Sequence, residues 1–400
     1  MDTFNRTLIQ ALFSLERYCE KVLWKGYDPY DGLNSLLFKI TPFYKKPAFR
    51  LAWSFLVRNL PFNARPFLLI SKGYNPKALA LFISSYSRLY STFKEPVYLS
   101  KARFLAKILQ SKQIKDFTAP SWGYNFPWQS KVLFAPEGVP NAICTTFAGQ
   151  ALLDLWEITK QNEFANIARA ICDFLLNDLN KLETQKGICF SYTPLDNVWV
   201  HNVNLWIAAF LSRVWSLTGE DFLLEIAKKA VNFTLSYQNS DGSWFYGTGN
   251  KNLLYIDNYH TGFNIVALRE FINYTGESSP YESHLRRGYD YYKRTFFLPS
   301  GAPRYYHNKL FPMDIHCSAQ GIITHTLMGD IERAKKIAEW TIENMFNPQK
   351  GFFYYRKLPA YTIKIPFIRW GEGWMFYALT YLITTQNTLS AVSLANKEKR

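Results

Sequence analysis

The chain has 400 residues, a net charge of +15, 48% hydrophobic residues and 18% aromatic residues. This composition excludes a disordered chain and allows a large hydrophobic core. The five cysteines are scattered and form no CxxC pair, and their odd number argues against a disulfide framework. The N-terminus has no secretory signal pattern, and no uncharged run is long enough to span a bilayer. We therefore expect a cytoplasmic protein, either free or peripheral at the inner membrane face.

The first 72 residues are predicted to form a helix, roughly Thr3 to Leu23, and then a basic, aromatic segment. Between Gly32 and Lys94 the chain has no acidic residue and ten basic ones. This pattern favours contact with an anionic membrane surface or a lipid-linked substrate through residues 32–94. A merely solvated basic face is the alternative. Nucleic acid is not expected as a partner, because no nucleic-acid-binding motif accompanies the charge.

A polar cluster then recurs roughly every 57 residues, and each copy opens an apolar helical stretch. The clusters begin near Asn75, Asn141, His201, Asp257, Asp314 and Arg369. A period of this size indicates one supersecondary unit that is used several times.

The clearest repeat begins at His201 and predicts a helical hairpin. The stretch 205–211 is apolar almost all round, which is typical of a helix buried on every side. Gly219 ends this helix, and an amphipathic helix follows from Phe222 to Tyr237. A glycine turn and a short aromatic segment, residues 242–246, complete the repeat. One buried and one amphipathic helix per repeat predict an inner ring of helices wrapped by an outer ring.

Six inner helices are predicted after residue 73, but only five outer ones. The last inner helix, Trp370 to Thr384, has no outer partner, and residues 386–400 are polar and expected to fray. The N-terminal helix is expected to supply the sixth outer helix. We predict an all-α (α/α)6 toroid over residues 73–385, with residues 1–72 packed on it and closing it. An open solenoid of helical hairpins is the alternative, but it would need polar caps at its ends.

Several motifs resemble those of known toroidal proteins. The segment from Lys229 through Gln238 and Gly242 to Trp244 resembles the Gln-Trp repeat of triterpene cyclases. The Thr-Gly-Glu loops and glycine-aromatic turns resemble the six-hairpin toroids of glycosidases, polysaccharide lyases and uronyl epimerases. The whole pattern, with residues 26–31 (Gly-Tyr-Asp-Pro-Tyr-Asp), resembles uncharacterised proteins of bacterial surface-polysaccharide clusters. The acidic run of a protonating terpene cyclase is absent, so cyclisation is not expected.

In a closed toroid the starts of all inner helices lie at one end of the central cavity, so the polar clusters converge. The predicted catalytic residues are His260, Tyr259, Asp257, His316, Asp314 and Glu372. The predicted substrate-binding residues are Asn141, His201, Asn202, Asn204, Arg369, Trp370, Trp374 and Trp244. Some of them could simply cap a helix, a role worth about 1 kcal/mol, but caps do not require His, Arg or Tyr.

Two reactions fit this inventory. The first abstracts the C5 proton of a uronic acid, for β-elimination or epimerisation, with His and Tyr as base and acid. The lyases that the toroid resembles use the same residue types. The second is hydrolysis by paired carboxylates drawn from Asp257, Asp314 and Glu372. We favour proton abstraction on an acidic glycan or a lipid-linked oligosaccharide. A toroid that binds glycan or lipid without turnover is the non-catalytic alternative.

No cofactor and no metal are expected. Asp314, His316 and Cys317 could join His260 around zinc, as mixed ligands do in other toroids. However, no second Cys or His follows at ligand spacing.

Overall fold

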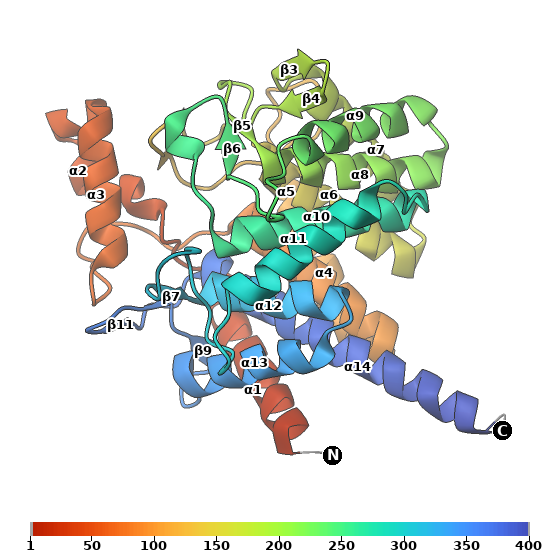
Figure 1. Ribbon diagram of the computed structural model, residues 1–400. Helices are drawn as coiled ribbons and strands as arrows, with labels where there is room; N and C mark the ends of the chain where they lie inside the picture. The colour runs from red at the N-terminus through yellow and green to blue at the C-terminus, as the bar shows by residue number, and fades with distance from the viewer. Residues whose placement is uncertain (1–2, 399–400) are drawn as a thin grey trace.

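The computed structural model describes residues 3–398 and consists mainly of helices packed in hairpins (Figure 1). The inner helices are α4 (Pro76–Phe93), α6 (Ala142–Thr159), α8 (His201–Thr218), α10 (Asn258–Thr275), α12 (Ile315–Leu327) and α14 (Trp374–Glu398). The outer helices are α1 (Thr3–Lys21), α5 (Pro96–Ser111), α7 (Asn162–Asn177), α9 (Asp221–Leu235), α11 (Tyr281–Thr295) and α13 (Ile331–Met345).

The two sets of helices differ in burial, as their sequences require. The inner helices α6, α8 and α12 are buried over most of their lengths, because each lies between two inner neighbours and an outer helix. The outer helices α7, α9 and α13 bury one apolar face and leave charged residues in solvent. Burial on every side therefore distinguishes these inner helices from the outer ones.

The inner ring is closed. Each inner helix packs against the next, and α14 packs against α4. Helix α1 packs against α13 and α14, so the N-terminal helix stands where a sixth outer helix belongs. The predicted closed (α/α)6 toroid is therefore confirmed, and the open solenoid is excluded.

Several of the glycine turns that follow a hairpin pack against the next outer helix. Gly242 has φ +94°, and a Cβ there would lie 2.2 Å from the carbonyl oxygen of Arg287 in α11. Gly351 has φ +73°, and a Cβ there would lie 2.4 Å from the carbonyl oxygen of Ser14 in α1. Both positions need glycine for backbone conformation and for close approach. The turn at Gly351 thus packs against α1 in the same way that the turn at Gly242 packs against α11.

The last inner helix differs from its predicted bounds. Residues Ile368–Gly373 form a π-helical turn, η4, and the α-helix begins only at Trp374. Helix α14 continues past Thr384 to Glu398, so much of the segment expected to fray is helical. Residues 399 and 400 lie outside the described part of the chain.

The strands are short and link the hairpins at one end of the ring. They are β1 (Trp128–Gln129), β2 (Phe134–Ala135), β3 (Lys181–Thr184), β4 (Gly187–Phe190), β5 (Trp199–Val200), β6 (Gly247–Thr248), β7 (Met313–Asp314), β8 (Phe346–Asn347), β9 (Phe352–Phe353), β10 (Arg356–Lys357) and β11 (Thr362–Ile363). They pair antiparallel, as β1–β2, β3–β4, β5–β6, β8–β9 and the three-stranded β11–β10–β7. A further short helix, η3 (Lys251–Leu253), follows β6.

A small helical unit stands beside the ring, at the left of Figure 1. It comprises residues 31–70, which we call the rim unit, and contains η1 (Asp31–Asn34), α2 (Leu36–Lys39), η2 (Pro42–Lys45) and α3 (Pro47–Asn59). Among the helices of residues 3–398, none combines the length and the apolar character that crossing a bilayer requires.

Candidate active site

The N-terminal ends of the inner helices surround a cavity of about 730 Å³. Helix α3 and the loops between hairpins complete its wall. Eight tyrosines line it, and its basic and histidine side chains are Arg58, Lys77, Lys131, Arg369, His260 and His316. Within residues 4–387, whose side chains the structure describes, no aspartate or glutamate belongs to this lining. The cavity is therefore suited to an anionic ligand.

His260 and Asp257 form a hydrogen-bonded pair at the start of α10. The Nδ1 atom of His260 lies 2.8 Å from Oδ2 of Asp257, and the imidazole side chain is 15% exposed. Because a carboxylate only accepts hydrogen bonds, the neutral form of this imidazole carries its proton on Nδ1 and keeps the lone pair on Nε2. Asp257 also accepts the backbone N–H of His260 and so caps α10. The cap thus orients the imidazole ring of His260, which lines the cavity.

Tyr259 and His316 lie beside this pair. The ring centroid of Tyr259 is 4.0 Å from that of His260 and 4.8 Å from that of His316. Burial raises the pKa of Tyr259 well above its usual range, which keeps the phenol protonated. Burial, with the nearby charges of Lys77 and Arg369, holds the pKa of His316 well below its usual range. His316 is consequently a neutral imidazole, and neither of its ring nitrogens has a hydrogen-bond partner of good geometry.

Asp314 and Glu372 lie behind the cavity wall rather than in it. Asp314 accepts hydrogen bonds from Arg356 Nε at 2.7 Å, from Trp370 Nε1 at 2.8 Å and from the backbone N–H of His316. Trp370 itself lines the cavity. Glu372 accepts the backbone N–H of Phe353, and burial raises its pKa well above the usual range. Asp314 therefore positions two lining side chains, while Glu372 stays protonated away from the lining.

Arg369 is held in the cavity wall by the N-terminal Gly-Tyr-Asp-Pro-Tyr-Asp segment. Its Nε and one terminal nitrogen donate to the two oxygens of Asp28, both at 2.7 Å. Asp31, three residues later, pairs with Arg65 at 2.7 Å. The guanidinium of Arg369 also lies 4.8 Å from the ring of Tyr124. Residues 26–31 therefore fix an arginine that is more than 300 residues away in sequence.

Lys77 forms the floor of the cavity together with an aromatic layer. Its ammonium lies 4.4 Å from the ring of Phe147, 5.1 Å from Phe263 and 5.0 Å from Trp374. No carboxylate of the described residues pairs with it. Burial and the charge of Arg369 lower the pKa of Lys77 to about 7. This amine is therefore partly neutral near neutral pH, unlike an ordinary surface lysine.

The remaining predicted substrate-binding residues divide into one that lines the cavity and five that do not. Asn202 lines it, and its Oδ1 atom has no hydrogen-bond partner. The residues outside the lining are Asn141, His201, Asn204, Trp374 and Trp244. Asn141 caps α6, and Asn204 donates to the carbonyl groups of Ile188 and Ala230. These contacts are structural.

His201 and the two tryptophans are buried in packing contacts. His201 lies against Phe233 and Tyr237, and burial lowers its pKa to about 4. Trp374 belongs to the aromatic layer under Lys77. Trp244, in the segment that resembles a Gln-Trp repeat, donates to the carbonyl oxygen of Thr234 and packs where a Cβ at Gly288 would lie. That segment thus joins α9 to α11.

Sequence analysis missed Lys77 and Arg58 as individual site residues. Lys77 is the second residue of α4, directly after the capping Asn75, so the repeat could have identified it. Arg58 comes from α3, outside the repeats, and its guanidinium lies 5.1 Å from the ring of Tyr30. No acidic side chain of residues 4–387 forms an ion pair with either residue. Within the same range, no group of His, Cys, Asp and Glu has the geometry to hold a metal ion.

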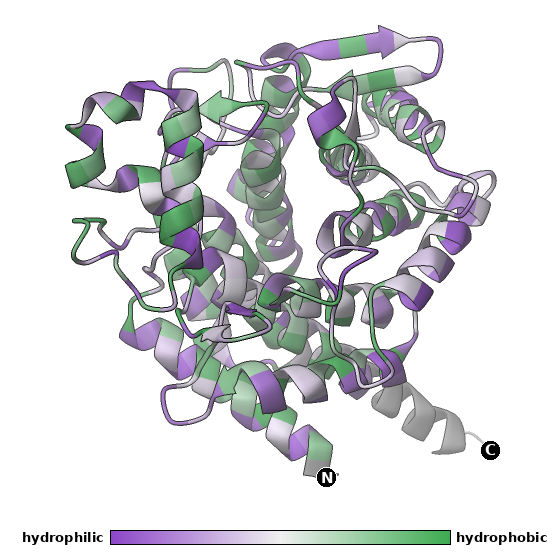
Figure 2. Cartoon of the chain, turned by 60° about the vertical axis from the view of Figure 1, so that its left-hand side comes forward, coloured by the Kyte–Doolittle hydropathy of each residue, from purple (hydrophilic) through white to green (hydrophobic). Residues whose placement is uncertain are grey.

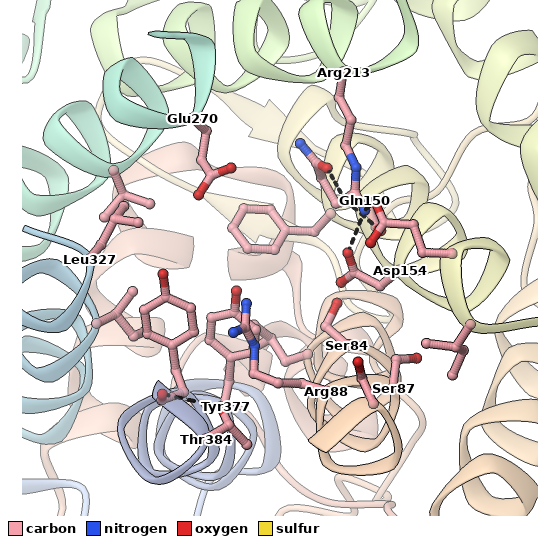
Figure 3. Close-up of a pocket in the computed structure, with 18 of the residues that line it drawn as sticks. Ser84, Ser87, Arg88, Gln150, Asp154, Arg213, Glu270, Leu327, Tyr377 and Thr384 are labelled. Carbon is pink, nitrogen blue, oxygen red and sulfur yellow. Dashed lines mark hydrogen bonds and ion pairs between the residues drawn. The ribbon is translucent and has the colours of Figure 1, made fainter. Parts of the chain in front are cut away.

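A second cavity of about 780 Å³ lies at the opposite, C-terminal ends of the inner helices (Figure 3). Arg213 donates to Gln150, Asp154 and Glu157 there, at 2.6 to 2.8 Å, while Glu270 reaches in from α10. Its charged lining is balanced, with Arg88, Lys160 and Arg213 against Asp154, Glu157 and Glu270. Phe147 lines this cavity and Phe263 lines the other, so the aromatic layer separates them. The anionic preference therefore belongs to the first cavity alone.

Comparison of sequences identifies no relative: no family model matches the chain, and no curated protein matches it. Solved structures do match. Cellobiose 2-epimerase from Bacillus thermoamylovorans B4167 aligns with a TM-score of 0.64 and 11% identity, over 78% of this chain and 88% of that one. An unsaturated glucuronyl hydrolase specific for heparin aligns with a TM-score of 0.62 and 10% identity, over 97% of this chain and 98% of that one.

A polysaccharide lyase also aligns, with a TM-score of 0.55 and 12% identity, over 78% of this chain and 90% of that chain. At these identities the likeness establishes the six-hairpin (α/α)6 fold and no particular activity.

Proposed function

We propose that this protein abstracts the C5 proton of a uronic acid in an acidic glycan, as lyases and epimerases do. The charge of the first cavity carries the proposal. Two histidines and four basic side chains line it, and no carboxylate of the described residues does. A uronate would bring the negative charge that this lining lacks. The eight tyrosines offer ring faces for sugar stacking and hydroxyl groups for hydrogen bonds.

The residues support a balanced proton-transfer step. Nε2 of His260 takes the C5 proton, and the electrons of the C–H bond move into the substrate carboxylate. Arg58 and Lys77 stabilise the added negative charge, because neither is neutralised by a protein carboxylate. Tyr259 then supplies a proton. Protonation of C5 on the opposite face gives the epimer, whereas loss of the protonated C4 oxygen leaves a 4,5-double bond.

Hydrolysis by paired carboxylates, the alternative, has less support from the geometry. Asp257 is engaged by His260, and Asp314 is engaged by Arg356 and Trp370. Glu372 faces the backbone of Phe353. None of the three belongs to the cavity lining, whereas a glycosidase needs two carboxyl groups that flank the scissile bond.

The biological setting of this proposal is bacterial surface-polysaccharide biosynthesis. The structural neighbours are named for epimerisation, hydrolysis and lysis of sugars, which supports a carbohydrate substrate. The Gly-Tyr-Asp-Pro-Tyr-Asp segment holds Arg369 in the cavity wall through Asp28, so the motif that resembles polysaccharide-cluster proteins serves the site. We propose an acidic, lipid-linked precursor in the cytoplasm as the natural substrate.

The test incubates the protein in D2O with oligosaccharides of glucuronic, galacturonic and mannuronic acid, and follows them by NMR and mass spectrometry. We expect deuterium at C5, with or without a 4,5-double bond. The His260→Gln variant should lose about 100-fold or more in rate, because general base catalysis contributes at least that much. His284→Gln is the control, since His284 contacts Gln238 outside the cavity.

Two results would contradict the proposal. New reducing ends without deuterium or a double bond would identify a hydrolase. Binding of a uronate without any change in it, and equal affinity in His260→Gln, would identify a glycan-binding toroid.

A further inference from the structure

The rim unit is an ordered structure with a core of its own. Phe38 and Trp53 stack with centroids 4.7 Å apart, and Tyr44 packs against Phe38 from another side. Arg50 donates to Gln129 at 2.8 Å and so ties the unit to the loop that carries β1. The ion pair between Arg65 and Asp31 is buried. Because the rim unit is folded and tied to the ring, the side chains on its outer surface stay exposed to solvent in the folded protein.

The outer surface of the rim unit is rich in apolar side chains. Ile40 is 82% exposed and Phe67 is 77% exposed. Of the 22 large hydrophobic side chains that are exposed in the described residues, ten lie between Leu36 and Leu69. Hydrophobic and hydrophilic residues alternate along the helices of the unit (Figure 2). An apolar surface this dense marks a contact surface.

The exposed charged side chains of the rim unit itself are all basic. Burial raises the pKa of Tyr44, and the exposed Glu137, which follows β2, is the acidic group that contributes to this rise. Lys39, Lys45 and Lys46 of the rim unit, and Lys72 directly after it, are exposed or half-buried, and none forms an ion pair within the described residues. Other basic residues of the segment, such as Arg50, Arg65 and Lys77, point inward and do not contribute. No acidic residue occurs between Gly32 and Lys94. Two copies of this face would bring lysine against lysine, whereas an anionic lipid surface complements it.

We propose that the rim unit binds the surface of an anionic lipid bilayer. The exposed Phe, Ile and Leu side chains enter the interfacial region, and the lysines contact lipid phosphates. Helix α3 also supplies Leu51, Ala52, Ser54, Phe55 and Arg58 to the wall of the first cavity. Since a helix with its side chains is about 10–12 Å across, the bilayer surface lies close to the cavity mouth. A lipid-linked sugar could then enter the cavity while its lipid stays in the membrane.

The test is flotation of the full chain with vesicles of phosphatidylcholine, and with vesicles of equimolar phosphatidylcholine and phosphatidylglycerol. We expect binding to the anionic vesicles that weakens as salt is added. The variant Ile40→Ser/Phe43→Ser/Phe67→Ser and the variant Lys39→Glu/Lys45→Glu/Lys46→Glu should each weaken it by about tenfold or more. None of the six replaced side chains lines the cavity, so turnover of a water-soluble substrate should be unchanged.

The matched control is Leu195→Ser/Leu217→Ser/Phe222→Ser, whose side chains are 61%, 43% and 45% exposed on the toroid. It should bind the anionic vesicles as the natural protein does, and circular dichroism should show that all variants are folded. The inference is overturned if the natural protein does not bind anionic vesicles, or if the control triple weakens binding equally. It is also overturned if the apolar triple only turns a dimer into a monomer in sedimentation velocity. His260→Gln should bind vesicles normally, so this surface can be tested apart from the proposed reaction.

Discussion

Lys77 places a buried ammonium group in the cavity, and burying this charge without a carboxylate partner destabilises the folded protein. Its ammonium is held by three aromatic rings rather than by a carboxylate, in a position that is only 3% exposed. A cation over aromatic rings is stabilised, but less than the same cation in water or in an ion pair. The lowered pKa of about 7 expresses this deficit. Strongly shifted pKa values of this kind are common among functional groups, so Lys77 is a residue to test by mutation.

Replacement of Lys77 by Met should stabilise the protein and reduce its turnover. The charged form is favoured more in the unfolded chain, where the pKa is near 10.5, than in the fold, where it is about 7. The unfolded state therefore binds more protons between these values, and the stability of the natural protein rises with pH across that window. The advantage of Lys77→Met should be largest below pH 7 and should shrink by about 1.4 kcal/mol per pH unit above it.

Urea unfolding of both proteins at several pH values measures this difference. An advantage that does not change between pH 7 and 10 would show that Lys77 carries no such penalty. Turnover of a uronate substrate should fall, because the Lys77→Met variant removes a cavity cation that no protein carboxylate neutralises.

The sequence could not show which residues of each polar cluster face the cavity. Some of them cap the helix, and helix geometry turns others away from the ring axis. In α8, Asn202 faces the cavity, while Asn204 points outward to α9 and β4. Successive residues of a helix point about 100° apart, so only some of each cluster can face the axis. Asp314 and Glu372 lie two positions from the lining residues His316 and Trp370 and still face away from the cavity. The convergence of the clusters was predictable, but the inward direction of each side chain required the structure.

At the level of helices and turns, the glycine-aromatic turns fix where each outer helix lies. Gly242→Ala should destabilise the protein by about 3 kcal/mol or more, because it adds a strained φ and a clash with the carbonyl of Arg287. Gly276 is the matched control: it has φ +69° but nothing within 4 Å of a Cβ. Gly276→Ala should cost only about 1 kcal/mol, the strain of φ alone. Thermal and urea unfolding compare the two, and equal losses would show that the contact with α11 has no energetic role.

The helical hairpins were predictable because their signals are local and repeated. Burial around α8 and amphipathicity along α9 both follow from residue order. The π-helical turn at Ile368–Gly373 was not predictable, since its residues read as an ordinary helix start. Its wider winding lets Arg369 and Trp370 line the cavity while Glu372 faces Phe353. The rim unit lies outside the repeat, so its contribution of Arg58 to the cavity had no signal in the sequence.

At the scale of the whole molecule, the ring presents two cavities of different charge at its two ends. The first has only basic and neutral lining, and the second has balanced charge. The turn at Gly351 against α1 joins the two ends of the chain, so both cavities depend on the N-terminal helix. The number of repeats predicted this closure, but sequence alone did not indicate the second cavity.

The aromatic layer of Phe147, Phe263 and Trp374 makes the first cavity a dead end. A long glycan cannot thread through the ring, so it can bring only a chain end or a side branch to His260. A lyase of this shape would shorten polymers from their termini instead of cutting them at random. Viscometry of a uronic acid polymer checks this. We expect viscosity to fall slowly while small unsaturated sugars accumulate, and an early collapse of viscosity would require an open groove.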